Sequence, residues 1–307
     1  MGAAAVYVVP PRVAIDTRSV DTSRWDHVRL RDDDIIVATW SKTGTTLTQQ
    51  MVWQLITGGA DGVASITVSP WVDNRWAAPA ADMAAMLEAQ TERRVMKTHA
   101  PFESVPFSPE VKYLYIGRDG RDVLWSFYNH LTSFTDVTIE RMNAQDGPWP
   151  AYTRLEIGVR ELYLHWLETD QIPGSDTSSS FWDHVRGWWD QRQRPNVLLL
   201  HYASLIADRA GEMRRLARFL DIAVDEGRLP AMVARCQIDY MRDQAGGTPH
   251  YRAFKDGAAN FFNQGINGRW RDVLSPEEIA LCDAVAGRRL PAACAHWLKT
   301  GEAPDRN

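Results

Sequence analysis

Residues 34–56, DIIVATWSKTGTTLTQQMVWQLI, decide the fold of this chain. A short apolar run at 35–38 stops at the polar turn SKTGTT (41–46), and an amphipathic segment follows. This order predicts a buried strand, a tight turn and the start of a helix. A helix start carries main-chain N–H groups without partners and the positive end of the helix dipole, so the turn suits an anion. Lys42 adds a positive charge beside it.

The turn differs from the phosphate loop of nucleotide triphosphatases. That loop has a second glycine four residues before its Gly-Lys pair. Here Lys42 precedes Gly44, and residues 37–40 contain no glycine. A turn this short can enclose one phosphate group but hardly a triphosphate. The alternative is an ordinary strand–helix turn capped by Thr45 or Thr46, and the turn alone leaves both interpretations open.

The composition of the 307 residues limits the class of protein. With 45% hydrophobic residues the chain can bury a large core, and its net charge of −5 argues against a nucleic-acid partner. Cys236, Cys282 and Cys294 lack metal-ligand spacing, which predicts free thiols in a reducing compartment. The apolar start, MGAAAVYVVPPRV, is broken by two prolines and is too short to span a membrane. We therefore expect a cytoplasmic protein with no membrane partner.

Strand and helix patterns alternate along the chain, which predicts one α/β domain over residues 1–307, with a central, mainly parallel sheet flanked by helices. The further predicted strands are 93–98, 111–117 and 196–202, and the predicted helices are 45–56, 121–131, 155–168, 181–193, 211–220 and 276–290. Outside this pattern lie an N-terminal extension (1–30), a flexible, lid-like loop (172–180) and irregular segments at 70–79, 132–150 and 243–268. Such irregular segments usually build substrate pockets in α/β proteins.

A second informative segment is RVMKTHAP at 94–101. In a strand, alternate residues share a face, so we expect Lys97 and His99 to project together. A neighbouring lysine lowers the pKa of a histidine by like-charge repulsion, and a neutral imidazole could accept a proton from a substrate hydroxyl. The alternative is that His99 only caps the turn before Pro101.

Two later segments carry phosphate-binding chemistry. In YIGRDGRDVLWSFYNH (115–130), a strand end places Arg118 near Ser126 of the following helix, and an arginine fork with a serine donor fits a phosphate. The alternative is a surface ion pair of Arg118 with Asp122. In NFFNQGINGRW (260–270), two glycines predict a tight loop that can approach a ligand, although a linker to the last helix is the alternative.

These segments, in this order, resemble the cytosolic-type sulfotransferases, which use 3′-phosphoadenosine 5′-phosphosulfate (PAPS) as donor. The matching sequences are SKTGTT (41–46), KTHAP (97–101), YIGRDGRDV with SFY (115–128), WDHV with WW (182–189), and FFNQG with GRW (261–270). The resemblance implies His99 as the catalytic base, assisted by Lys42 and Lys97. It further implies a set of cofactor-binding residues: Lys42, Thr43, Gly44, Thr45 and Thr46 at the 5′-phosphosulfate, Arg118 and Ser126 at the 3′-phosphate, Tyr202, Leu47 and Ile238 near the adenine, and Asn263, Gln264 and Gly265 in a capping loop at 243–268.

The reaction implied is in-line transfer of the sulfuryl group to the hydroxyl of a small-molecule acceptor, with no metal. His99 would take the hydroxyl proton while Lys42, Lys97 and the helix start stabilise the developing charge. Several aromatic residues could line an acceptor pocket, with plain core packing as the alternative for each: Trp71, Trp76, Phe134, Trp149, Tyr152 and the tryptophans at 182–189.

The chain departs from the family pattern in its capping loop. Asn263 and Gln264 replace an expected Arg-Lys pair, so we expect weaker 3′-phosphate binding, with Arg118 and one of Arg252, Lys255 or Arg269 compensating. The usual dimer motif is not recognisable at 271–280, which leaves the oligomeric state open. Two other functions stay possible: a degenerate nucleotide-binding protein of the same fold, and a phosphoryl-transfer enzyme related to nucleotide kinases.

Overall fold

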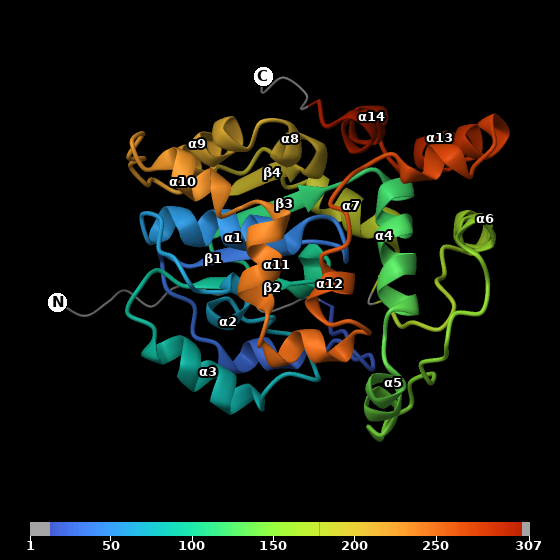
Figure 1. The fold of residues 1–307 in the computed structure, drawn as a ribbon, viewed down its shortest axis with the longest axis horizontal. Helices are drawn as coiled ribbons and strands as arrows, with labels where there is room; N and C mark the ends of the chain where they lie inside the picture. The colour runs from blue at the N-terminus through green and yellow to red at the C-terminus, as the bar shows by residue number, and fades with distance from the viewer. Residues whose placement is uncertain (1–12, 178, 303–307) are drawn as a thin grey trace.

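The computed structural model describes residues 13–177 and 179–302. Within these ranges, four strands form one parallel sheet in the order β2-β1-β3-β4 (Figure 1). The strands are β1 (Ile35–Ala38), β2 (Val95–Thr98), β3 (Lys112–Gly117) and β4 (Val197–His201). The structure thus confirms the predicted α/β fold with a central parallel sheet. The first twelve residues of the expected N-terminal extension, and residue 178 of the expected lid-like loop, lie outside the described residues.

Helices cover both faces of the sheet, which explains why its strands are continuously apolar. Ile35 and Val37 point to the face covered by α1 (Thr45–Ile56), α9 (Arg209–Phe219) and α10 (Leu229–Ala234). Ile36 and Ala38 point to the face covered by α4 (Gly120–Thr132), α7 (Phe181–Trp189) and α14 (Ala292–Thr300). Each fully buried aliphatic side chain contributes about 1.5–3 kcal/mol, so a shift of register by one residue would be costly.

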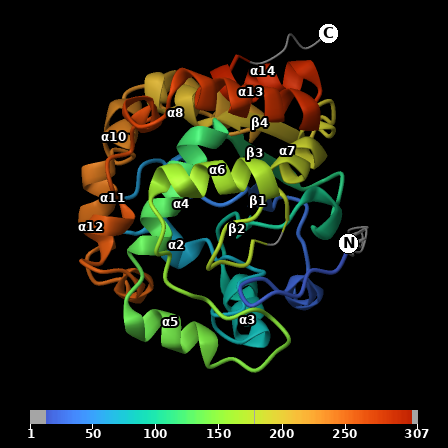
Figure 2. The same cartoon turned by 90° about the vertical axis from the view of Figure 1, so that its right-hand side faces the viewer.

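The other helices lie around this core. They are η1 (Thr22–His27), α2 (Ser65–Val68), α3 (Ala80–Ala89), η2 (Phe102–Ser104), α5 (Asp136–Asn143), α6 (Val159–Thr169), α8 (Tyr202–Ala207), α11 (Ile238–Ala245), η3 (Pro249–Ala253), α12 (Ala258–Phe261), η4 (Arg269–Asp272) and α13 (Pro276–Arg289). Figure 2 shows α6 outside α4, against which it packs. Of the helices in the described ranges, none has the length and hydropathy needed to cross a membrane.

Several elements differ from the sequence-based expectation. The segment 132–150 is not wholly irregular, because Thr135 accepts a hydrogen bond from the amide of Thr138 and starts α5. The segment 243–268 contains η3 and α12. Tyr202 is the first residue of α8 rather than the last of a strand.

The tryptophans near the start and end of α7 belong to the core. Trp182, Trp188 and Trp189 are at most 2% exposed, and the ring of Trp188 stacks on Tyr115 of β3 at 5.5 Å. For these three tryptophans the alternative of plain core packing therefore holds, and not the acceptor pocket. Packing against the sheet removes them from any pocket surface.

The strand order creates a crevice at the carboxyl ends of β1 and β3, because the connections that follow these two strands leave toward opposite sides of the sheet. Each strand delivers one candidate residue to this edge. Lys42 follows β1, His99 follows β2, Arg118 follows β3 and Tyr202 follows β4. The sheet therefore places the four sequence motifs next to one another.

Candidate active site

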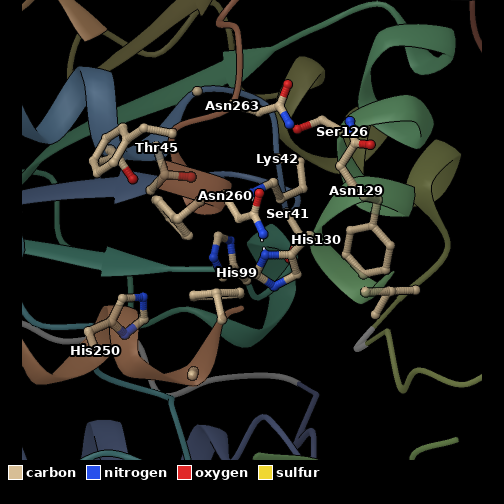
Figure 3. Close-up of a pocket in the computed structure, with 18 of the residues that line it drawn as sticks. Ser41, Lys42, Thr45, His99, Ser126, Asn129, His130, His250, Asn260 and Asn263 are labelled. Atoms are coloured by element: carbon tan, nitrogen blue, oxygen red, sulfur yellow. Dashed lines mark hydrogen bonds between the residues drawn. The ribbon is translucent and has the colours of Figure 1, made fainter. Parts of the chain in front are cut away.

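A cavity of about 1140 Å³ opens at this edge of the sheet (Figure 3). This is more than most pockets that hold one drug-sized ligand, so two reactants can occupy it together. The candidate residues that line it are Lys42, Gly44, Thr45, Thr46, Leu47, Lys97, His99, Arg118, Ser126, Tyr202, Ile238, Asn263, Gln264 and Gly265. Within the described residues, no group of three His, Cys, Asp or Glu side chains is arranged to hold a metal ion.

The turn after β1 presents main-chain N–H groups to this cavity. Lys42 and Gly44 have φ angles of 71° and 122°, and a Cβ added at Gly44 would lie 2.7 Å from Cδ2 of Tyr202. Among the described residues, no side chain caps the start of α1, so its first N–H groups stay available for an anion. Thr43 is the exception among the expected ligands. Its buried hydroxyl donates to the carbonyl oxygen of Trp40, so only its main chain can face a ligand.

Two lysines, Lys42 and Lys97, line the cavity beside the carboxyl ends of β1 and β2. Burial, followed by repulsion from Arg118 and Lys97, lowers the pKa of Lys42 to about 7. Burial lowers the pKa of Lys97 to about 8, opposed by the nearby carboxylate of Asp73. Nζ of Lys97 lies 4.9 Å from the centre of the Trp71 ring, and Nζ of Lys42 lies 4.6 Å from that of Phe261. An anionic ligand would relieve the repulsion and restore both charges.

His99 is a neutral imidazole with a defined tautomer. Burial, and then repulsion from Lys97, lowers the pKa of His99 well below its ordinary value. Nδ1 lies 2.9 Å from the carbonyl oxygen of Thr39, which can only accept a hydrogen bond. Nδ1 therefore carries the proton, and the basic lone pair is on Nε2. This is the protonation state that a general base for a hydroxyl group requires.

Three residues provide support for His99 that the sequence analysis did not name. The hydroxyl of Thr39 lies 3.0 Å from Nδ1 of His99 and 2.8 Å from the hydroxyl of Thr45, so it joins the histidine to the phosphate turn. Trp71 packs edge-on against the His99 ring at 4.6 Å. The carboxylate of Asp73, fully buried, accepts hydrogen bonds from the Trp71 indole and the Thr98 hydroxyl. A single polar residue in a loop gives no pattern by which sequence alone could find this support.

Arg118 connects three parts of the cavity. Its guanidinium donates to the Lys42 carbonyl at 3.0 Å, the Asn267 side chain at 3.0 Å and the Ile266 carbonyl at 3.3 Å. It also lies 4.2 Å from the centre of the Tyr202 ring, whose hydroxyl donates to the Gly265 carbonyl. The alternative of an ion pair with Asp122 is not observed, since that carboxylate accepts from the amide of Gly268. Arg118 thus ties the phosphate turn to the capping loop.

The part of the capping loop that carries the two amides is exposed. Asn263 and Gln264 are both solvent-exposed, and the side-chain oxygen of Asn263 accepts from Arg269 at 3.1 Å. Of the three cations expected to compensate, Arg252 and Arg269 line the cavity. Lys255 does not line the cavity; its ammonium donates to the Thr132 carbonyl. Of these three cations, Arg269 is therefore the one bonded to Asn263.

The other end of the cavity is aromatic and carries one polar cluster. Four of the expected aromatic residues line it: Trp71, Trp76, Phe134 and Tyr152. Trp149 does not, and instead packs on the guanidinium of Arg75. Asp176, from the loop at 172–180, accepts hydrogen bonds from the hydroxyls of Ser19 and Tyr152. This loop thus forms part of the cavity wall.

The sequence reading also missed His130, which lines the cavity from α4. It follows Ser126 by four residues, and residues four apart share a face of a helix. This four-residue spacing from Ser126 could have identified His130 as a candidate from the sequence alone. Figure 3 shows His130 and His99 in the middle of the cavity, with Ser126 and Asn263 toward one end.

Comparison with known proteins gives consistent results. The model of the sulfotransferase domain family matches residues 32–292. A glycolipid sulfotransferase of Mycobacterium bovis (strain BCG / Pasteur 1173P2) is 32% identical over 293 residues, covering 87% of this chain and 88% of the relative. Sulfotransferase 1B1 of Mus musculus is 25% identical over 269 residues, covering 84% and 82%.

Solved structures share the fold. Mouse sulfotransferase SULT7A1 complexed with PAP matches with a TM-score of 0.69 at 19% identity, covering 92% of this chain and 93% of that one. Retinol dehydratase in complex with androsterone and the inactive cofactor PAP matches with a TM-score of 0.69 at 21% identity, covering 94% and 90%.

Proposed function

This chain belongs to the sulfotransferase domain family, and from that membership we propose that it transfers a sulfuryl group from PAPS to a hydroxyl group of a small acceptor. The observation that carries the proposal is the meeting of three groups at adjacent strand ends. These are an uncapped helix start with Lys42, a neutral His99 whose Nε2 can accept a proton, and the buried cation Arg118.

The residues present fit the two anionic ends of PAPS. The N–H groups of the phosphate turn and the Lys42 ammonium would hold the 5′-phosphosulfate. Arg118 and Ser126 would hold the 3′-phosphate, with Asn263, Gln264 and Gly265 closing over it from the capping loop. When bound, PAPS supplies a sulfuryl group on a phosphate leaving group. Tyr202 would lie near the adenine.

The chain's own residues would then act on the acceptor. Nε2 of His99 accepts the hydroxyl proton while Nδ1–H stays bound to the Thr39 carbonyl, which keeps the ring in one orientation. Lys42 and Lys97 donate to the oxygens on which negative charge develops. The buried surroundings strengthen these interactions relative to water.

The acceptor is proposed to be a hydroxyl compound with an apolar part. Trp71, Trp76, Phe134 and Tyr152 line the far end of the cavity, which favours contact with an apolar body. The relatives point the same way, since one is named a glycolipid sulfotransferase and a structural neighbour holds androsterone.

The test of this proposal is transfer of label from ³⁵S-labelled PAPS. The purified protein is incubated with a panel of phenols, sterols and alkyl glycosides, and the products are separated from free donor. We expect a labelled sulfate ester with at least one acceptor. Donor binding without any labelled ester would instead identify a degenerate nucleotide-binding protein.

A further inference from the structure

His130 is an enclosed histidine to which the proposed function gives no role. Its ring lies 4.9 Å from that of Phe134, 5.0 Å from Phe254 and 6.3 Å from Phe261. Burial, and then repulsion from Lys42 and other nearby cations and imidazoles, lowers the pKa of His130 well below its ordinary value. The imidazole is therefore neutral near pH 7 and has one donor and one acceptor nitrogen.

The contact with Lys42 determines which nitrogen is the donor. Nδ1 of His130 lies 3.5 Å from Nζ of Lys42. In the complex with an anionic nucleotide Lys42 is protonated and can only donate, so Nδ1 of His130 accepts and the imidazole proton is on Nε2. His99 has the opposite tautomer, because its Nδ1–H donates to the Thr39 carbonyl. The cavity thus contains two different Nε2 atoms. That of His99 can accept a proton, and that of His130 donates a hydrogen bond.

The donor of His130 has no acceptor within the protein. Among residues 13–177 and 179–302, Nε2 of His130 makes no hydrogen bond, and the side chain lines the cavity. A donor held in an aromatic surrounding is costly to leave without a partner when water is displaced. Its partner in a complex must therefore come from the bound molecule.

We propose that Nε2–H of His130 donates to an acceptor oxygen next to the hydroxyl group that reacts at His99. The preferred acceptors are then vicinal diols, as in a sugar ring, rather than compounds with an isolated hydroxyl. This inference rests on the proposed function, which assigns His99 as the base. It extends that function by naming a specificity-determining residue and the chemical class that it selects.

The far end of the cavity fits the same class. Asp176, Ser19 and Tyr152 form a hydrogen-bonded cluster that can exchange bonds with further hydroxyl groups. The Trp76 ring, packed edge-on to Tyr152 at 5.7 Å, lines the cavity and offers an apolar surface to the C–H groups of a sugar. An isolated alcohol would leave this cluster without a ligand partner.

The test compares two probes that share an octyl chain on a six-membered ring. Octyl β-D-glucopyranoside offers vicinal hydroxyls, and 4-octylcyclohexanol offers one hydroxyl. Their affinities are measured by calorimetry on protein saturated with PAP. We expect tighter binding of the glucoside, and about a tenfold loss of glucoside affinity in His130→Phe with little change for the alcohol. Phenylalanine keeps the aromatic packing and removes both nitrogens.

Two further variants make the result specific. In His130→Gln the amide can place a donor near the former Nε2, so part of the glucoside affinity should return. His250→Phe makes the same ring change at another residue that lines the cavity. His250 lies beside Phe254 and Phe261, at 6.2 and 5.8 Å, and makes no hydrogen bond to Lys42. It should leave the affinity ratio of the two probes unchanged.

Three results would overturn the inference. One is an equal loss for both probes in His130→Phe, which would place the donor at the reacting hydroxyl or the sulfuryl oxygens. Another is a loss of PAP affinity in that variant, which would mean that His130 acts through Lys42. The third is a wild-type protein that binds PAP but not the glucoside. Failure to bind PAP at all would instead count against the proposed function.

Discussion

The part of the cavity that would hold the nucleotide has two ends, and these are built differently. We call them the reacting end, with Lys42, Lys97 and His99, and the outer end, with Arg118, Asn263 and Gln264. The reacting end is formed by residues at the ends of β1 and β2. Lys97 and His99 are less than 10% exposed there, and Thr39 links His99 to Thr45 in the turn after β1. The outer end relies on Arg118, which directly follows β3, and on the exposed amides Asn263 and Gln264. The first end is buried and holds two lysines whose charges an anionic ligand would restore, whereas the second presents two neutral amides from its loop.

From this difference we expect the turnover rate and the affinity for the nucleotide to be controlled by different residues. Groups fixed by the sheet can be aligned to the reacting atoms without reorganisation, which is what transition-state stabilisation requires. A loop with neutral amides contributes hydrogen bonds about half as strong as charged ones. Changes at the reacting end should therefore alter turnover most, and changes in the loop should alter nucleotide affinity alone.

The largest effect is expected for His99→Ala. Loss of the general base should lower kcat by about 10² to 10⁴ while PAP affinity stays nearly constant, because no proposed phosphate ligand is removed. Turnover of labelled PAPS and calorimetry with PAP measure the two quantities. The control is His296→Ala. It changes an exposed histidine of α14 that is hydrogen-bonded to Glu302. Retained turnover in His99→Ala would remove this residue as the base.

Lys42→Ala should have the next largest effect, and on both quantities. Loss of a preorganised cation should lower kcat by about 10² to 10³ and weaken PAP binding as well. The same assays apply. Lys255→Ala is the matched control, since that lysine is exposed and bonded to the Thr132 carbonyl outside the cavity lining. A loss of affinity with unchanged turnover would mean that Lys42 only binds the donor.

Nucleotide affinity should fall as the pH rises. The pKa values of Lys42 and Lys97 are lowered to about 7 and 8 without ligand. An anionic nucleotide favours their charged forms and so raises both values in the complex. Binding is therefore strongest below about pH 7 and weakens by up to about tenfold per pH unit for each lysine above its free pKa. Calorimetry between pH 6.5 and 8.5 in two buffers should show proton uptake; constant affinity would contradict the lowered values.

The smallest effect is a gain at the outer end. Asn263→Arg with Gln264→Lys replaces neutral donors by charged ones, which should tighten PAP binding by about threefold to tenfold and leave kcat nearly unchanged. The same pair of substitutions should not affect adenosine 5′-phosphate, which has no 3′-phosphate. An equal gain for both nucleotides would indicate general attraction of anions rather than a contact at this end.

Much of this architecture could be predicted from local sequence. The apolar run before SKTGTT and the alternation in VMKT are local patterns, and they correctly located β1, the turn that follows it and β2. Arg118 and Ser126 could be placed because a strand end and a helix start lie close in the chain.

The remaining features depend on contacts between distant segments. His130 is enclosed by Phe254 and Phe261, which belong to the other end of the chain. Asp73 supports the reacting end through Trp71 and Thr98, and neither bond leaves a periodic signature. For the tryptophans of α7 the sequence leaves a pocket and the core both open, because aromatic residues pack well in either, and contacts with the sheet place them in the core.

The central claim is that the cavity holds both the 5′ and the 3′ phosphate end of one nucleotide, and it can be tested directly. Calorimetry compares 3′-phosphoadenosine 5′-phosphate with adenosine 5′-phosphate, which keeps the 5′ end and lacks the 3′-phosphate. The placement of Arg118 and Ser126 predicts that the first nucleotide binds at least about tenfold more tightly. Equal affinities would contradict the assignment of the outer end.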